Sequence, residues 1–319
     1  PPRLDARTNG FAVMNKVIIG IHGLGNKPRA ALLHEWWLNA MHEGLERIGN
    51  PRQEIPFKMV YWADVSFSEP LDPSLTDPED PLFVKEPYAA GPACPTASKP
   101  QKLRMHLLRF IEEHIDRLFL NKNLTEKFPG ASAKIIEHYF EELNTYYTHE
   151  CVSLENKDCS AKGAIQARLR GLIEEHKGCE IMLMAHSMGS IIAFDVLSNP
   201  SVDCRISTFV TMGSPLGMPP IVVRNFGVQK ALHPELSKPE APHCITKHWY
   251  NLSDRRDTIA LDHTLRDDYR SNRNGIKAID LLLRNDYRYN GEANPHKSFG
   301  YLRARETAGI IDAFLSGRA

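Results

Sequence analysis

Short apolar runs alternate with amphipathic stretches along most of this chain. The short runs contain β-branched residues and end at turn residues, which is typical of buried strands; they lie at 16–21, 57–63, 180–184, 208–212 and 245–252. Between them apolar residues recur at helical spacing, as in the set Leu32, Leu33, Trp36, Trp37, Ala40, Met41 and Leu45. Strands that alternate with helices predict an α/β fold, with a mostly parallel central sheet and helices on both faces.

The regular alternation stops after Asp64. Residues 65–100 contain eight prolines, a density that excludes a continuous helix or a central strand. Two amphipathic stretches follow, at 103–118 and 136–147. We therefore expect residues 65–150 to form a helical and loop cap, or lid, inserted into a core made of residues 14–63 and 160–319. Near the C-terminus, residues 276–283 fit a strand or a short helix, because periodicity alone does not separate the two.

Composition and charge narrow the possible partners. The chain carries 39 basic and 39 acidic residues without a basic cluster, so nucleic acid is not an expected partner. No apolar run is long enough to span a bilayer. Residues 1–13 lack a pattern and precede Met14, so we expect a disordered or appended segment. The cysteines lack a metal-binding spacing, which favours reduced thiols and a cytoplasmic location, with a Cys151–Cys159 bridge as an alternative; they are Cys94, Cys151, Cys159, Cys179, Cys204 and Cys244.

One serine lies at the apex of a predicted strand–turn–helix unit. The apolar run 180–184 leads into Ala185-His186-Ser187-Met188-Gly189, and apolar residues at helical spacing follow at 190–197. Small residues flank the serine, as a turn this sharp requires where strand and helix pass closely. The arrangement resembles the nucleophile elbow of the α/β-hydrolase superfamily, with Ala185 in place of the first glycine of the G-x-S-x-G pattern.

A second glycine-containing turn follows the first predicted strand. Residues 16–21 run into His22-Gly23-Leu24-Gly25-Asn26, which resembles the oxyanion loop of lipases and esterases in this superfamily. The resemblance implies that the backbone N–H groups of Leu24 and Met188 form the oxyanion hole. An ordinary glycine turn is the alternative. His22 itself fits a structural, hydrogen-bonded histidine better than a catalytic one.

The acid and the base of such a site should follow later strands. After the strand at 245–252, Asp257-Thr258-Ile259-Ala260 resembles the pattern around the acid of related hydrolases. Asp254 precedes two arginines and fits a turn former, and Asp262 is a third option. His296 follows a polar segment and is the best candidate for the base, since His263 lies too close to Asp257 to occupy a separate loop. The order Ser187, Asp257, His296 is the order of this superfamily.

A Gly-Ser-Pro turn follows the strand at 208–212. Residues 213–217 resemble a turn found at this place in lipase-like hydrolases, which predicts a pocket wall beside Ser187. The residues expected to contact substrate are His22, Gly23, His186, Pro215 and Leu216. Because the carboxyl ends of parallel strands meet at one edge of a sheet, these turns should converge there.

The resemblance implies a lipase-like or esterase-like enzyme. Such an enzyme cleaves a small-molecule carboxylic ester through an acyl-serine intermediate and needs no metal or organic cofactor. A thioesterase, amidase or acyltransferase of the same fold is an alternative, as is a non-catalytic binding protein on this scaffold. The sequence does not indicate an oligomeric state.

Overall fold

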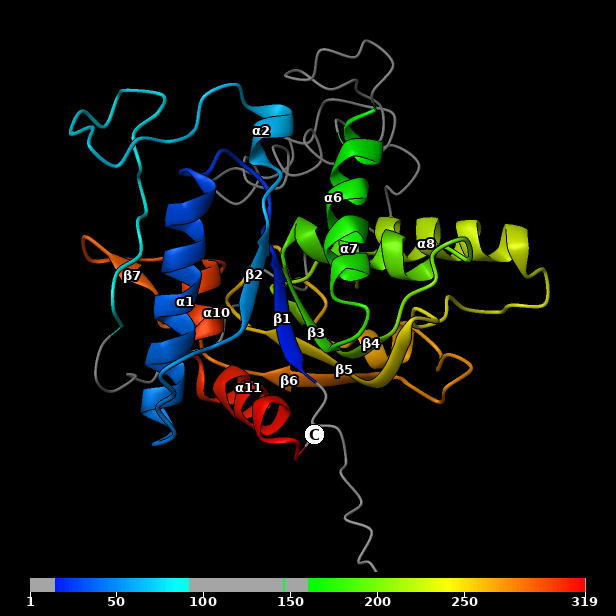
Figure 1. Ribbon diagram of the computed structural model, residues 1–319. Helices are drawn as coiled ribbons and strands as arrows, with labels where there is room; N and C mark the ends of the chain where they lie inside the picture. The colour runs from blue at the N-terminus through cyan, green and yellow to red at the C-terminus, as the bar shows by residue number, and fades with distance from the viewer. Residues whose placement is uncertain (1–14, 92–145, 147–159, 319) are drawn as a thin grey trace, which may run out of the picture.

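The computed structural model describes residues 15–91, 146 and 160–318, and its centre is a six-stranded sheet (Figure 1). The strand order is β2-β1-β3-β4-β5-β6, and every neighbouring pair is parallel. The strands are β1 Lys16–Ile21, β2 Phe57–Val60, β3 Glu180–His186, β4 Ile206–Met212, β5 Ile245–Ser253 and β6 Ala278–Leu282. The predicted parallel sheet is therefore confirmed, and residues 278–282 are a strand rather than a helix.

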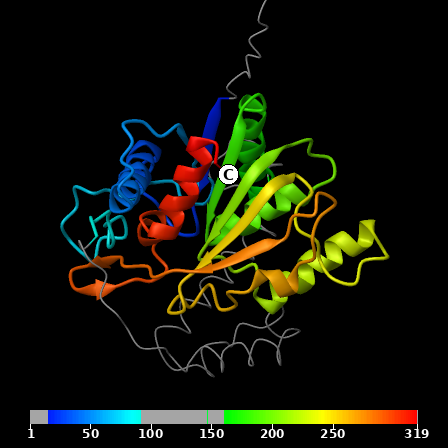
Figure 2. The ribbon, with the colours of Figure 1, turned by 90° about the horizontal axis from the view of Figure 1, so that it is seen from below.

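Helices cover both faces of the sheet (Figures 1 and 2). On one face lie α1 Ala30–Arg47, α10 Ser298–Leu302 and α11 Arg305–Ser316; on the other lie α6 Ala161–Glu175, α7 Met188–Ser198 and α8 Pro219–Leu232. Successive strand residues alternate between the two cores, so that Ile18 and Met182 pack with α1 whereas Ile19 and Leu183 pack with α6 and α7. Burial on both faces explains why the central strands read as continuous apolar runs.

The edge strand β2 is shorter than the strand that the apolar run at 57–63 predicted. It stops at Val60, and Ala63–Ser66 forms the short helix α2. Trp62 causes the change of direction, because its backbone N–H donates to His22 Nε2 and its indole N–H donates to the His22 carbonyl. These two bonds draw the chain away from the sheet and toward the loop that follows β1.

The proline-rich segment after α2 is irregular but anchored. Two side chains hold residues 88–91, where the described part of this segment ends. Glu43 on α1 accepts hydrogen bonds from the Tyr88 hydroxyl and the Gly91 N–H. Buried Arg303 donates to the Ala89 carbonyl. Apart from Tyr146, the predicted helices at 103–118 and 136–147 lie outside the described residues, as do residues 1–13. The cap therefore stays a prediction.

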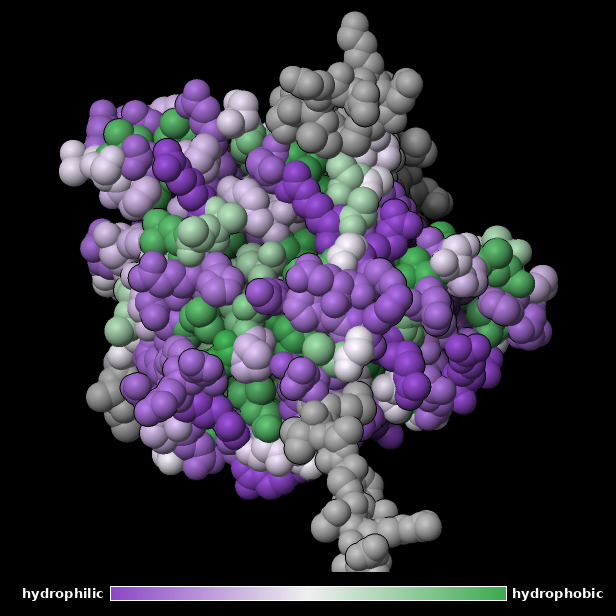
Figure 3. Space-filling model, viewed as in Figure 1, coloured by the Kyte–Doolittle hydropathy of each residue, from purple (hydrophilic) through white to green (hydrophobic). Residues whose placement is uncertain are grey.

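The remaining elements lie outside the main sheet. They are α9 Leu265–Asp268 and a two-stranded hairpin of β7 Arg288–Tyr289 and β8 Glu292–Ala293. Helix α8 projects beyond the sheet (Figure 1), and apolar side chains show on its surface (Figure 3). Val223, Val228 and Leu232 are each more than half exposed there. None of the helices that the structure describes is long and apolar enough to cross a membrane.

One cysteine pair corrects the expectation of reduced thiols. Cys204 and Cys244 form a disulfide across 40 residues of sequence. They precede β4 and β5, two neighbouring strands whose parallel pairing begins at Ile206 and Ile245. Spacing along the chain does not reveal such a pair, because only the sheet brings it together. Cys179 is free, and Cys94, Cys151 and Cys159 lie outside the described residues.

Candidate active site

Ser187 lies at a strained turn between β3 and α7. Its φ of 54° and ψ of −129° are unusual for a residue other than glycine. Gly189 makes the turn possible, because a Cβ at that position would stand 2.6 Å from the Ile21 carbonyl oxygen. Ala185 is fully buried on the strand side. Small residues thus let strand and helix approach, and the turn places the serine at the carboxyl edge of the sheet.

Three side chains that are far apart in the sequence form one hydrogen-bonded line. Ser187 Oγ lies 2.9 Å from His296 Nε2, and His296 Nδ1 lies 2.9 Å from both carboxylate oxygens of Asp257. Because a carboxylate only accepts, Nδ1 carries the imidazole proton and Nε2 is left to accept the serine hydroxyl proton. His296 can therefore take the proton of Ser187 as the serine oxygen attacks an electrophile, and can return the proton afterwards.

The Asp257 carboxylate is buried but remains well supplied with donors. Oδ1 accepts from the Ile259 N–H at 2.8 Å, and Oδ2 accepts from the Tyr301 hydroxyl at 2.7 Å. Burial by itself would raise the pKa of Asp257, but the imidazole of His296 and these hydrogen bonds outweigh it and lower the pKa below its usual value. Asp257 is thus an ionised partner for the imidazole.

The two competing aspartates lie elsewhere. Asp254 forms an ion pair with Arg256 at 2.6 Å and accepts from the Asn285 N–H at 2.7 Å. Asp262 accepts from the N–H and the hydroxyl of Thr264 in a local turn. Only Asp257 of the three is hydrogen-bonded to His296, and Asp254 has the turn role that the two following arginines indicated.

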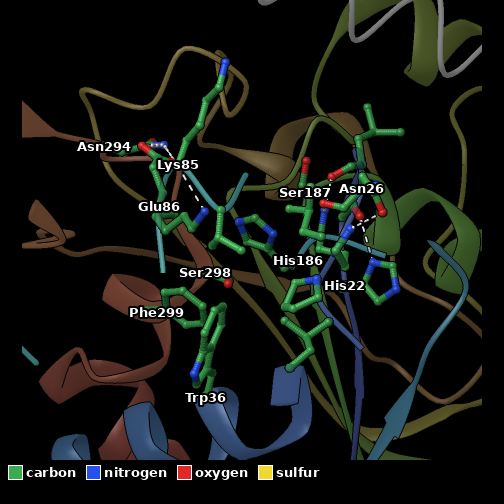
Figure 4. A pocket seen from close by; sticks show the side chains of 18 of the residues that line it. His22, Asn26, Trp36, Lys85, Glu86, His186, Ser187, Asn294, Ser298 and Phe299 are labelled. Atoms are coloured by element: carbon green, nitrogen blue, oxygen red, sulfur yellow. Dashed lines mark hydrogen bonds and ion pairs between the residues drawn. The ribbon is translucent and has the colours of Figure 1, made fainter. Parts of the chain in front are cut away.

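Side chains on both sides hold the backbone of His296. Its N–H donates to Asn294 Oδ1 at 2.9 Å, and its carbonyl accepts from His186 Nε2 at 2.7 Å. Asn294 in turn donates to both oxygens of Glu86 at 2.9 Å, as the dashed lines in Figure 4 show. Sequence reasoning did not find Glu86 or Asn294, because no local pattern marks a contact across 208 residues.

The loop after β1 passes directly against the serine. A Cβ on Gly23 would lie 2.6 Å from Ser187 Cβ, so only glycine fits. The ammonium of Lys27 binds the carbonyls of Leu24 and Gly25, which gathers them on one side of the loop. The N–H of Met188 begins helix α7, where the first N–H groups have no intrahelical acceptor. Leu24 and Met188 therefore remain the candidate donors to an oxyanion.

A pocket of about 610 Å³ opens in front of Ser187 (Figure 4). Trp36 and Phe299 line one side of it, and Glu86 and Asn294 line another. Its lining also includes His22, Gly23, Leu24, His186 and the proline-rich segment at Leu71 and at residues 81, 83, 84 and 85. This first part of the predicted cap thus forms a pocket wall.

Two residues expected in the pocket wall are not there. Pro215 and Leu216 are buried and are absent from the pocket lining. Leu216 packs in the core on the α7 face, and its carbonyl accepts from the Tyr269 hydroxyl at 2.9 Å. The turn folds inward because Ser214 bonds Ser190 Oγ at 2.7 Å, which ties it to helix α7. The prediction for Pro215 and Leu216 is therefore wrong.

The two buried histidines are neutral supports. His22 accepts from Trp62 through Nε2 and donates from Nδ1 to the Gly23 carbonyl at 2.8 Å. Burial is the main reason that the pKa values of His22 and His186 lie well below 6.5, with Lys27 lowering the first further and His296 the second. His22 therefore has the structural role that the sequence favoured, although it also borders the pocket.

These histidines predict sensitivity to acid. Each binds a proton more readily in the unfolded chain, so the free energy of unfolding should fall as the pH drops below about 6.5, by up to about 1.4 kcal/mol per histidine and pH unit. Urea unfolding at pH 7.5 and pH 5.0 measures the loss. His186→Gln should reduce the dependence on pH, whereas His233→Gln, at an exposed position, should leave it unchanged. A wild-type stability that is constant across this range would contradict the prediction.

Comparisons of the chain with family models, with curated proteins and with solved structures gave no match. Within the residues that the structure describes, no three histidine, cysteine, aspartate or glutamate side chains are grouped so that they could hold a metal ion.

Proposed function

We propose that this protein is a serine hydrolase of the α/β-hydrolase type that cleaves carboxylic esters. The observation that carries the proposal is the hydrogen-bonded line Ser187–His296–Asp257 at the mouth of the pocket. The fold supports it, since the nucleophile follows a central parallel strand, the acid follows a later one, and the base comes last.

The reaction would proceed in two halves. Ser187 Oγ attacks the ester carbonyl carbon while its proton passes to His296 Nε2, and the N–H groups of Leu24 and Met188 stabilise the oxyanion. The intermediate collapses as the alkoxide leaves with the proton from His296. Water then attacks the acyl-serine by the same route and releases the acid. Asp257 holds the imidazole in the required tautomer throughout.

Labelling and a substrate panel test this proposal. A fluorophosphonate probe should label the wild-type protein at Ser187, and p-nitrophenyl esters should be hydrolysed. The same panel should include a thioester and an anilide, because the three side chains alone do not separate these substrate classes. Absence of labelling and of turnover in folded protein would favour a binding protein instead.

Trp36 should set the preference for acyl chain length. Its ring borders the pocket on the side of Phe299, 5.9 Å away between ring centroids, and removing it takes apolar contact from a bound chain. Trp36→Ala should lower kcat/KM for p-nitrophenyl octanoate by roughly ten-fold while changing the acetate less than about two-fold.

Leu38→Ala is the control for that measurement. Leu38 lies on the same helix and packs against the core, but it does not line the pocket. It should therefore leave the ratio of octanoate to acetate turnover unchanged. An equal loss for both esters in Trp36→Ala would place the acyl chain on another wall.

A further inference from the structure

Tyr301 connects the Asp257 carboxylate to the backbone of the competing aspartate. It lies on α10 and is fully buried. Its hydroxyl lies 2.7 Å from Asp257 Oδ2 and 3.0 Å from the backbone nitrogen of Asp254. Because the N–H of Asp254 can only donate and the carboxylate can only accept, the single hydroxyl proton must point toward Asp257.

We propose that Tyr301 is a positioning residue that fixes the Asp257 carboxylate and thereby the orientation of the His296 imidazole. The proposal rests on the proposed serine hydrolase function, which it deepens. Its structural basis is the fixed direction of the hydroxyl proton, which the Asp254 N–H enforces from the opposite side.

The hydroxyl acts on both the position and the charge of the carboxylate. Oδ1 is held by the Ile259 N–H, so that Tyr301 supplies the second fixed point, on Oδ2, and the two together prevent the carboxylate from turning. The hydrogen bond from the Tyr301 hydroxyl to Oδ2 also withdraws negative charge from the carboxylate. That charge stabilises the protonated form of the imidazole. Removal of the hydroxyl should therefore loosen the hold of the Asp257 carboxylate on the imidazole of His296.

The other charged and titratable groups around this pair are accounted for. His186, at the end of β3, lies 4.9 Å from His296 between ring centroids, and burial together with His296 keeps its pKa well below the usual value. Lys297 is paired with Glu86 at 3.1 Å, and Lys27 binds loop carbonyls. Asp254 is paired with Arg256. None of these described groups takes the place of Asp257 at the imidazole of His296.

Tyr301→Phe tests the role, and Tyr269→Phe is its matched control. Tyr269 is equally buried; its hydroxyl donates to the Leu216 carbonyl at 2.9 Å and accepts from Asn225 at 3.0 Å, away from the pocket. Tyr301→Phe should lower kcat by roughly ten-fold and change the acid limb of the pH profile of kcat/KM. Tyr269→Phe also loses a buried hydroxyl, so it should lower the melting temperature about as much as Tyr301→Phe does. It should leave kcat and the pH profile of kcat/KM unchanged.

Two further measurements keep the proposal falsifiable. The proton NMR signal of His296 Nδ1–H, which the Asp257 carboxylate accepts, should move in Tyr301→Phe. This measurement needs no substrate, so it decides the role of Tyr301 even if ester hydrolysis is not found. Site-specific 3-fluorotyrosine at position 301 keeps the hydroxyl and donates more strongly, so it should move the same signal in the opposite direction. This variant does not depend on the folding of Tyr301→Phe. An unmoved Nδ1–H signal in the folded variants would overturn the proposal.

Discussion

Ser187→Ala should lower kcat/KM for p-nitrophenyl butyrate by roughly 10³-fold or more and abolish fluorophosphonate labelling. The loss is large because the Ser187 hydroxyl lies 2.9 Å from His296 Nε2, and none of the described residues places a second hydroxyl or thiol on that nitrogen. The variant should fold, since alanine removes one oxygen and keeps the Cβ that fits beside Gly23. Steady-state kinetics and circular dichroism on the purified variant measure both outcomes.

Ser214→Ala is the matched control for the nucleophile. Ser214 is a buried serine that follows β4, and its hydroxyl bonds Ser190 Oγ and the Leu216 N–H rather than an imidazole. Its removal should cost stability while turnover and labelling persist. Full activity in a folded Ser187→Ala protein, or loss of labelling only in Ser214→Ala, would refute the assignment of the nucleophile.

Asp257→Asn should reduce kcat by roughly 10³- to 10⁴-fold, whereas Asp254→Asn should reduce it less than about ten-fold. Asp257 accepts the imidazole Nδ1 proton, and an amide in its place no longer supplies the negative charge that favours this tautomer and the imidazolium. Within the described part of the chain, the Asp254 carboxylate is bonded to Arg256 and to the Asn285 N–H, not to an imidazole. The two variants, compared in the same ester assay, therefore separate the two aspartates.

Asp254→Asn should instead appear as a loss of stability. The carboxylate is nearly fully buried, with Arg256 and the Asn285 N–H as partners, and a neutral amide leaves the guanidinium without its counter-charge. We expect a decrease of about 1–3 kcal/mol in the free energy of unfolding, measured by urea titration. A larger loss of activity in Asp254→Asn than in Asp257→Asn would reverse the assignment of the acid.

Local patterns were sufficient to predict most of the sheet and the order of the candidate site. The runs that become β1, β3 and β4 are buried on both faces, so their composition alone marks them as strands. The turn at Ser187 is marked by Gly189, because a sharp turn imposes its residue types within a few positions. The choice of Asp257 over Asp254 also came from adjacent residues.

Contacts between distant segments could not be predicted in this way. The sequence alone determined the α/β class, the strand–turn–helix unit and Ser187, Asp257 and His296 as candidates, because these depend on neighbours in the chain. Only the tertiary structure decided that Cys204 meets Cys244, that Pro215 and Leu216 turn into the core, and that Tyr301 bonds Asp257. The physical reason is that each depends on how strands align and helices pack across 24 or more residues, which no local pattern encodes.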